Sequence, residues 1–130
     1  FTKGDTVYFV TKRRSDSLTR LYRLDAPKLG EVNVLTAVAD FDVRGRATGS
    51  DATPDGKRLV VLTYDALWMF EAKTPGGDDW FAGKVWWLPF KNVKGAEGVC
   101  FDGPDTIMIA AEEGAGKLYA VPVEKLTRVR

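Results

Sequence analysis

The sequence predicts an all-β chain built from a repeated unit. No apolar spacing typical of a helix is sustained for three turns anywhere in the chain. Instead, short runs rich in Val, Ile, Leu, Tyr, Phe and Trp recur between clusters of Gly, Pro, Asp and Ser, and related runs return roughly every 48 residues. Strands are therefore expected at 6–12, 18–25, 32–39, 47–53, 58–64, 66–72, 84–90, 97–101, 106–111 and 117–123.

The turns between these strands follow from local residue chemistry. The Pro-Asp-Gly-Lys turn at 54–57 separates two of the middle strands, and the stretch KTPGGDDW at 73–80 has the glycine and proline of a loop. Asp102-Gly103 marks the next turn, and EEGAG at 112–116 marks the last.

Three segments of the chain resemble one another. LTRLYRLDAP from Leu18, DALWMFEA from Asp65 and GKLYAVPVEKL from Gly116 each form a short aliphatic and aromatic strand after a polar turn. Matching Leu21, Leu67 and Leu118 gives spacings of 46 and 51 residues. Each segment follows a more hydrophobic strand: VYFVTKR, RLVVLTY or TIMIAAE. Four strands in a unit of roughly 48 residues is typical of a β-propeller blade.

The chain is thus expected to be a β-propeller fragment of somewhat under three four-stranded blades, with an incomplete ring. Residues 1–43 would supply the second to fourth strands of one blade, 44–91 a complete blade, and 92–126 the first three strands of a last blade. A propeller closes with about four to eight blades, so the partners expected are missing N-terminal blades or further copies of the chain. The chain begins at Phe1 rather than Met, which also indicates a processed or excised piece.

These segments resemble a known group of proteins. VYFVTKRR with TRLYRLDAP, then ATGSDATPDGKRLVVLTYDALWMFE, then KGAEGVCFDGPDTIMIAAEE with GKLYAVPV, are similar to the last blades of bacterial phytase-like and SdiA-regulated-like propeller proteins. The resemblance implies a full propeller whose N-terminal blades are missing here, and an extracytoplasmic location, because such proteins are often exported. Some of these proteins bind calcium and a phosphorylated substrate at the mouth of the channel.

Composition excludes several kinds of function. The formal net charge is +1, from 19 basic and 18 acidic residues, so no clustered basic field points to nucleic acid. No apolar run approaches the roughly 18 residues of a membrane-spanning helix. The chain has no histidine, which excludes a Ser-His-Asp or Cys-His apparatus and His-bound zinc. The single cysteine, Cys100, lies between Val99 and Phe101 and is expected to be a buried structural thiol.

Propeller geometry predicts where charged residues gather. The first strand of each blade begins, and the second ends, at the same face, so their loops surround one mouth of the channel. Glu113 is expected at the same corner as Glu112, although such an acidic pair is more typical of a solvated turn. The candidate ligand-binding residues at this mouth are Lys12, Arg13, Arg46, Tyr64, Asp65 and Glu112.

Asp51 and Glu97 are the candidate metal ligands. In GSDAT and GAEGV they are expected at comparable places, near the start of the first strand of successive blades. Carboxylate oxygens suit calcium or magnesium, and calcium is the candidate cofactor, although the sequence makes none certain. The alternative is that both carboxylates accept hydrogen bonds from backbone N–H groups of the next blade and hold the ring together.

Three functions remain open at the level of sequence. The favoured one is a ligand-binding or scaffolding domain, which makes an enzyme activity of this chain alone the less favoured reading. The second is a calcium-dependent phosphoester or lactone hydrolase, in which the ion would polarise the substrate. The third is a proteolytic remnant or self-assembling structural fragment without an activity of its own.

Overall fold

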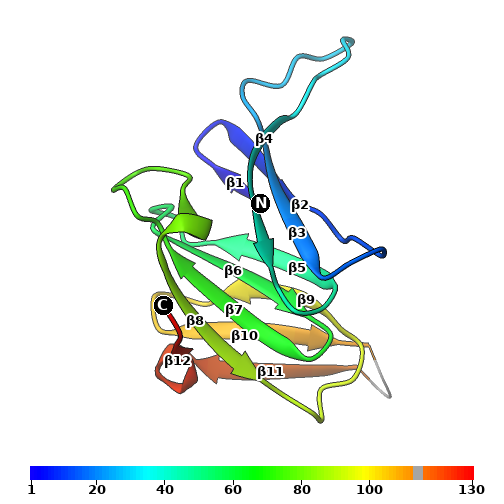
Figure 1. Cartoon of the computed structure of the whole chain (residues 1–130), viewed down its shortest axis with the longest axis vertical. Helices are drawn as coiled ribbons and strands as arrows, with labels where there is room; N and C mark the ends of the chain where they lie inside the picture. Colours follow the sequence, from blue (N-terminus) through cyan, green and yellow to red (C-terminus); the bar gives the residue numbers. More distant parts are fainter. Residues whose placement is uncertain (113–115) are drawn as a thin grey trace.

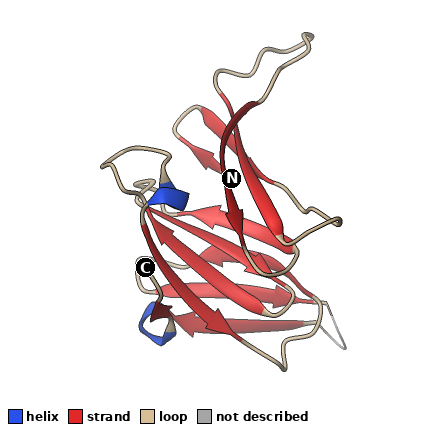
Figure 2. Cartoon of the chain, in the orientation of Figure 1, coloured by secondary structure: helices blue, strands red, loops and turns tan. Residues whose placement is uncertain are grey.

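The computed structural model describes residues 1–112 and 116–130, and this part of the chain is built of antiparallel strands (Figures 1 and 2). Two short 3-10 helices, η1 (Trp80–Ala82) and η2 (Val123–Lys125), interrupt them. None of the described helices is long and apolar enough to cross a membrane. The strands are β1 (Thr2–Lys3), β2 (Thr6–Val10), β3 (Leu18–Leu24), β4 (Thr36–Asp42), β5 (Ala47–Ala52), β6 (Arg58–Thr63), β7 (Ala66–Glu71), β8 (Lys84–Pro89), β9 (Ala96–Phe101), β10 (Thr106–Ala111), β11 (Lys117–Pro122) and β12 (Thr127–Arg128).

The strands form three sheets, which follow one another along the chain except that β12 returns to the second sheet. The first sheet has the order β1-β2-β3-β4, the second β12-β8-β7-β6-β5 and the third β11-β10-β9. Within each sheet consecutive strands are neighbours, as in an up-and-down propeller blade. The fold is therefore an all-β partial propeller of three sheets that do not close into a ring, in agreement with the sequence prediction.

The second sheet lies between the other two and is buried on both faces. Because side chains alternate along a strand, β6 sends Leu59 and Val61 to one face and Val60 and Leu62 to the other, and all four are fully buried. This explains why RLVVLT is a continuous apolar run rather than an alternating one. Fully burying a side chain of this size contributes roughly 1.5–3 kcal/mol.

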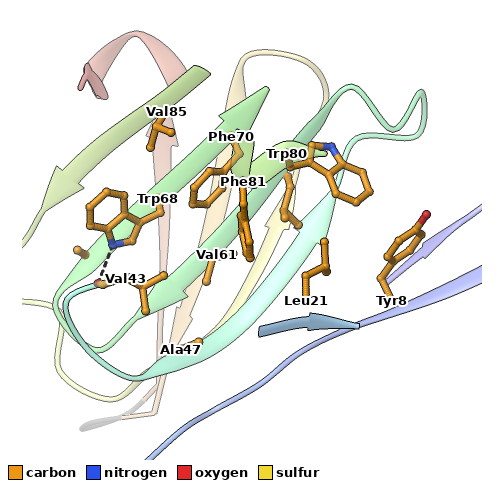
Figure 3. Packing of buried hydrophobic residues seen from close by; sticks show 12 residues of the cluster. Tyr8, Leu21, Val43, Ala47, Val61, Trp68, Phe70, Trp80, Phe81 and Val85 are labelled. Carbon is orange, nitrogen blue, oxygen red and sulfur yellow. Dashed lines mark hydrogen bonds between the residues drawn. The ribbon is translucent and has the colours of Figure 1, made fainter. Parts of the chain in front are cut away.

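The contact between the first and second sheets is rich in aromatic side chains (Figure 3). Trp68 is buried there, and its indole N–H donates to the carbonyl oxygen of Val43 over 2.9 Å. Phe41 of β4 contacts Phe70 edge to face, with ring centroids 4.8 Å apart. Trp80 of η1 is fully buried and donates to the carbonyl oxygen of Gly56 over 3.0 Å. These aromatic contacts tie β4, β7 and η1 into one cluster.

The position predicted for the third strand is wrong. A strand was expected at 32–39, but β4 spans Thr36–Asp42, and the loop before it projects away from the sheets (Figure 1). Val32 and Val34 alternate like strand residues, yet they are 94% and 82% exposed. The position of β4 is instead fixed by Phe41, which packs against Trp68 and Phe70 of the second sheet.

Other differences concern short elements and the cysteine. The first sheet has an additional short strand, β1, and β12 joins the second sheet beside β8; neither was expected from the sequence. Cys100 is exposed rather than buried, because it points to the outer side of the third sheet while its neighbours Val99 and Phe101 pack inward.

Candidate functional site

Corners between the second and third strands of each sheet lie at one face of the molecule. In the first two sheets a threonine forms the corner: the backbone N–H of Arg20 donates to the Thr11 hydroxyl over 2.9 Å, and that of Ala66 donates to the Thr63 hydroxyl over 3.0 Å. Lys12 and Tyr64 directly follow these threonines, so they occupy equivalent positions. Their side chains are thereby presented at the same face of neighbouring sheets.

Lys12, Tyr64 and Glu97 form a hydrogen-bonded chain across all three sheets. The ammonium of Lys12 donates to the Tyr64 hydroxyl over 2.7 Å and lies 4.8 Å from the centre of the Tyr64 ring. The Tyr64 hydroxyl donates to Oε1 of Glu97 over 3.0 Å. Lys12 Nζ and Glu97 Oε1 are 3.9 Å apart. We call these three residues the mouth triad.

The mouth triad is exposed to solvent. The side chains of Lys12 and Glu97 are 38% and 42% exposed. An ion pair with this exposure contributes at most about 1 kcal/mol to stability. The contact between these side chains therefore adds little to the stability of the fold. Their polar atoms remain accessible to a ligand.

A β-bulge places Glu97 at the mouth. Along β9 the register with β10 shifts after Ala96, so Glu97 is the extra residue, and along β5 the register with β6 shifts in the same way at Thr48. Thr48 and Glu97 are therefore the equivalent residues of the two sheets. The Thr48 hydroxyl donates to the carbonyl oxygen of Ala96 over 2.7 Å, which ties the second sheet to the third.

The prediction that Asp51 and Glu97 occupy comparable places is wrong. Asp51 lies near the end of β5, three residues beyond the bulge at Thr48, whereas Glu97 is the bulged residue itself. Strand register equates Gly49 with Gly98 rather than with Gly95, so matching GSDAT with GAEGV displaced the comparison by three residues.

Asp51 bonds the neighbouring sheet. One of its carboxylate oxygens accepts a hydrogen bond from the backbone N–H of Phe101 over 2.9 Å. This is the structural alternative that the sequence left open for Asp51. Within residues 1–112 and 116–130, no group of three or more Asp, Glu or Cys side chains is arranged so that it could hold a metal ion.

The remaining candidate residues lie apart from the mouth triad. Arg13 pairs with Asp16 over 2.6 Å, and Asp65 accepts a hydrogen bond from the Thr63 hydroxyl over 2.9 Å. Arg46 and Glu112 are exposed. In the described part of the chain, no hydrogen bond or ion pair joins any of these four to the mouth triad. Glu113 lies outside the described residues.

A hollow of about 240 Å³ adjoins Lys12. Val10 and Lys12 line it from the first sheet, and residues 47–50 line it from β5. Sequence analysis did not identify Thr48, Gly49 and Ser50 as part of the mouth, although the small residues in ATGSD are a signal for it. Gly49 is needed because a Cβ atom there would lie 3.1 Å from the carbonyl oxygen of Glu97, closer than most side chains tolerate.

Larger hollows lie at the opposite ends of the strands. One of them measures about 420 Å³ and is lined by residues of the 53–58 turn with Gly103 and Pro104. Arg58 donates there to the carbonyl oxygen of Pro104 over 2.9 Å. Its lining comes from tight turns and gathers no polar cluster shared by three sheets, so we place the candidate site at the mouth triad.

Comparisons with known proteins leave the family of this chain open. No protein-family model matches it, and a search of curated proteins finds no match.

Proposed function

We propose that this partial propeller is a ligand-binding domain, and that the mouth triad with the adjoining hollow binds a small molecule that carries an anionic group. One observation carries the proposal: each of the three sheets contributes one polar side chain to a single hydrogen-bonded chain beside a hollow. Ligand sites typically lie where loops meet at a concave mouth.

The chemistry of Lys12 suits an anionic ligand. An ammonium has three N–H donors, and the Tyr64 hydroxyl accepts one of them over 2.7 Å. Glu97 Oε1 lies 3.9 Å from Lys12 Nζ, and it also accepts a hydrogen bond from the Tyr64 hydroxyl. The negative charge of Glu97 is therefore shared between Lys12 and Tyr64. Lys12 therefore retains donors for a carboxylate or phosphate oxygen in the hollow that it lines.

Thermal unfolding with inorganic phosphate as the probe tests the proposal. A ligand that binds only the folded state raises the melting temperature. We expect phosphate to raise it for the wild type, against chloride at equal ionic strength, and to do so much less for Lys12→Met. Lys57→Met is the matched control, because Lys57 lies in the turn at the opposite face. Equal shifts in all three proteins, or no shift, would contradict the proposal.

A calcium titration separates this proposal from the calcium site predicted from the sequence. If the mouth binds an anion through Lys12, Glu97→Gln keeps the response to phosphate, since that change removes only a negative charge. A rise in melting temperature with calcium, lost in both Asp51→Asn and Glu97→Gln, would instead favour metal binding by these carboxylates.

A further inference from the structure

Two sheet faces of the chain are apolar and uncovered. On the outer side of the first sheet lie Val7, Phe9, Tyr22 and Leu24, of which Phe9 is 43% exposed. On the outer side of the third sheet Leu118 is 73% exposed, and Ala110 and Ala120 are exposed as well. We call these the first outer face and the third outer face. The third outer face comprises Cys100, Met108, Ala110, Leu118 and Ala120.

The first outer face corresponds to a face that the chain buries elsewhere. Strand register pairs Phe9 with Tyr22 in the first sheet and Val61 with Trp68 in the second. It likewise pairs Val7 with Leu24, and Leu59 with Phe70. The second-sheet residues of these pairs are at most 3% exposed, because the first sheet covers them.

The third outer face corresponds to the other face of the second sheet. Register pairs Ala110 with Leu118 and Leu62 with Leu67, and it pairs Met108 with Ala120 and Val60 with Met69. The second-sheet residues of these pairs are at most 1% exposed, because the third sheet covers them. The two outer faces are thus the two halves of an interface that the chain already forms twice.

We propose that the first outer face of one copy of this chain packs against the third outer face of a second copy. The sizes of the side chains favour this contact, since Phe9 and Tyr22 on one face meet Ala110 and Ala120 on the other. Such a contact joins two different surfaces, and contacts of this kind give a closed ring when the rotation between copies closes.

The number of sheets sets the number of copies. One copy supplies three sheets, fewer than the about four to eight blades with which propellers close. Two copies supply three plus three, which is six, and three copies would exceed the range. The assembly is therefore a two-copy ring with two equivalent contacts.

Charges at the mouth support the same arrangement. Lys12 and Tyr64 occupy equivalent corners of neighbouring sheets and touch over 2.7 Å. Glu112 follows β10 as Tyr64 follows β6, so it occupies the third corner. In the ring, the next corner after Glu112 is Lys12 of the second copy. An acidic side chain would then face a basic one at each contact between copies.

Sedimentation or light scattering of the 130-residue chain tests the proposal through its mass. We expect twice the 14.4 kDa of one copy, and a shift towards one copy on dilution. Phe9→Asp and Leu118→Asp should each give single, folded copies, because both side chains are exposed in one copy. Val34→Asp, in the exposed β3–β4 loop, is the matched control and should keep the two-copy mass.

Mixing the two variants tests which faces meet. Leu118→Asp retains an intact first outer face and Phe9→Asp an intact third outer face, so an equimolar mixture should regain one contact and the mass of two copies. A wild type that stays a single copy at high concentration would overturn the proposal. So would a mixture that remains single, since the two intact outer faces would then not bind each other, or an assembly that grows without closing.

Discussion

At the scale of single residues, Asp51 links two sheets through one carboxylate. We expect Asp51→Ala to lower the free energy of unfolding by about 1–3 kcal/mol, since it leaves the backbone N–H of Phe101 without its acceptor. Asp51→Asn should cost less, because the amide oxygen can still accept the bond. Urea unfolding measures both, with the exposed Asp105→Ala as control. Equal losses for the Ala and Asn variants would contradict the role of the hydrogen bond.

Glu71 makes the free energy of unfolding depend on pH. The hydrogen bond from Lys84, over 2.7 Å, holds the pKa of Glu71 below its ordinary 4.5 and outweighs the opposing effect of burial. A lowered pKa means that the folded state favours the charged form, so this contribution is present above pH 4.5 and is lost as pH falls through the folded-state pKa.

Replacing Glu71 should reduce this pH dependence. We expect Glu71→Gln to lower stability at pH 7 and to lose less stability than the wild type between pH 7 and pH 3, because it has no carboxyl group to protonate. Urea midpoints across this range measure the difference. Glu31→Gln, in the exposed β3–β4 loop, should follow the wild-type curve.

At the scale of elements, the β3–β4 loop and β6 contain similar residues with opposite roles. We expect Val32→Ser with Val34→Ser to change the free energy of unfolding by at most about 0.5 kcal/mol, because these side chains are 94% and 82% exposed. Leu62→Ala should cost about 2–5 kcal/mol, because Leu62 is fully buried between the second and third sheets. A large loss from the loop variant would mean that the loop packs somewhere in solution.

This contrast also explains how far the sequence could predict the fold. β6 and β7 were predicted almost to the residue, because the glycine turn before β6 and the polar corner Tyr64-Asp65 delimit their two apolar runs locally. Val32 and Val34 have the same local pattern, but the position of β4 depends on contacts of Phe41 with distant Trp68 and Phe70. β1 and β12 were missed because two residues are too short for a periodic signal.

The candidate site was predictable only in part, for a similar reason. Propeller geometry correctly suggested that Lys12 and Tyr64 share a face, since both follow the second strand of a sheet. Their contact with Glu97 depends on a bulge in β9, and the residues AEGVC contain no sequence signal that predicts this bulge. The role of Asp51 likewise depends on a neighbour 50 residues away.

At the scale of the whole molecule, the C-terminal residues tie the chain together. Arg128 and Thr127 pair with Trp86 and Trp87 of β8, and the guanidinium of Arg130 donates to the carbonyl oxygen of Phe81 over 2.5 Å. We expect Arg130→Ala to lower the free energy of unfolding by roughly 1–2 kcal/mol, because that carbonyl and the Gly83 carbonyl lose a charged donor. Thermal melting measures this loss. Arg14→Ala is the control, because Arg14 is exposed in the loop between β2 and β3. Equal melting temperatures for Arg130→Ala and the wild type would contradict this role.

The burial of the second sheet on both faces also has a consequence for hydrogen exchange. Amides of β6 and β7 can exchange only when the two flanking sheets separate, so they should report the global unfolding of the chain. Amides of β10 have a packed sheet on one side only, and in a single copy they can exchange through smaller openings. If two copies close into a ring, protection of β10 should rise with protein concentration while that of β6 changes little, so exchange would detect the second copy from within the sheet.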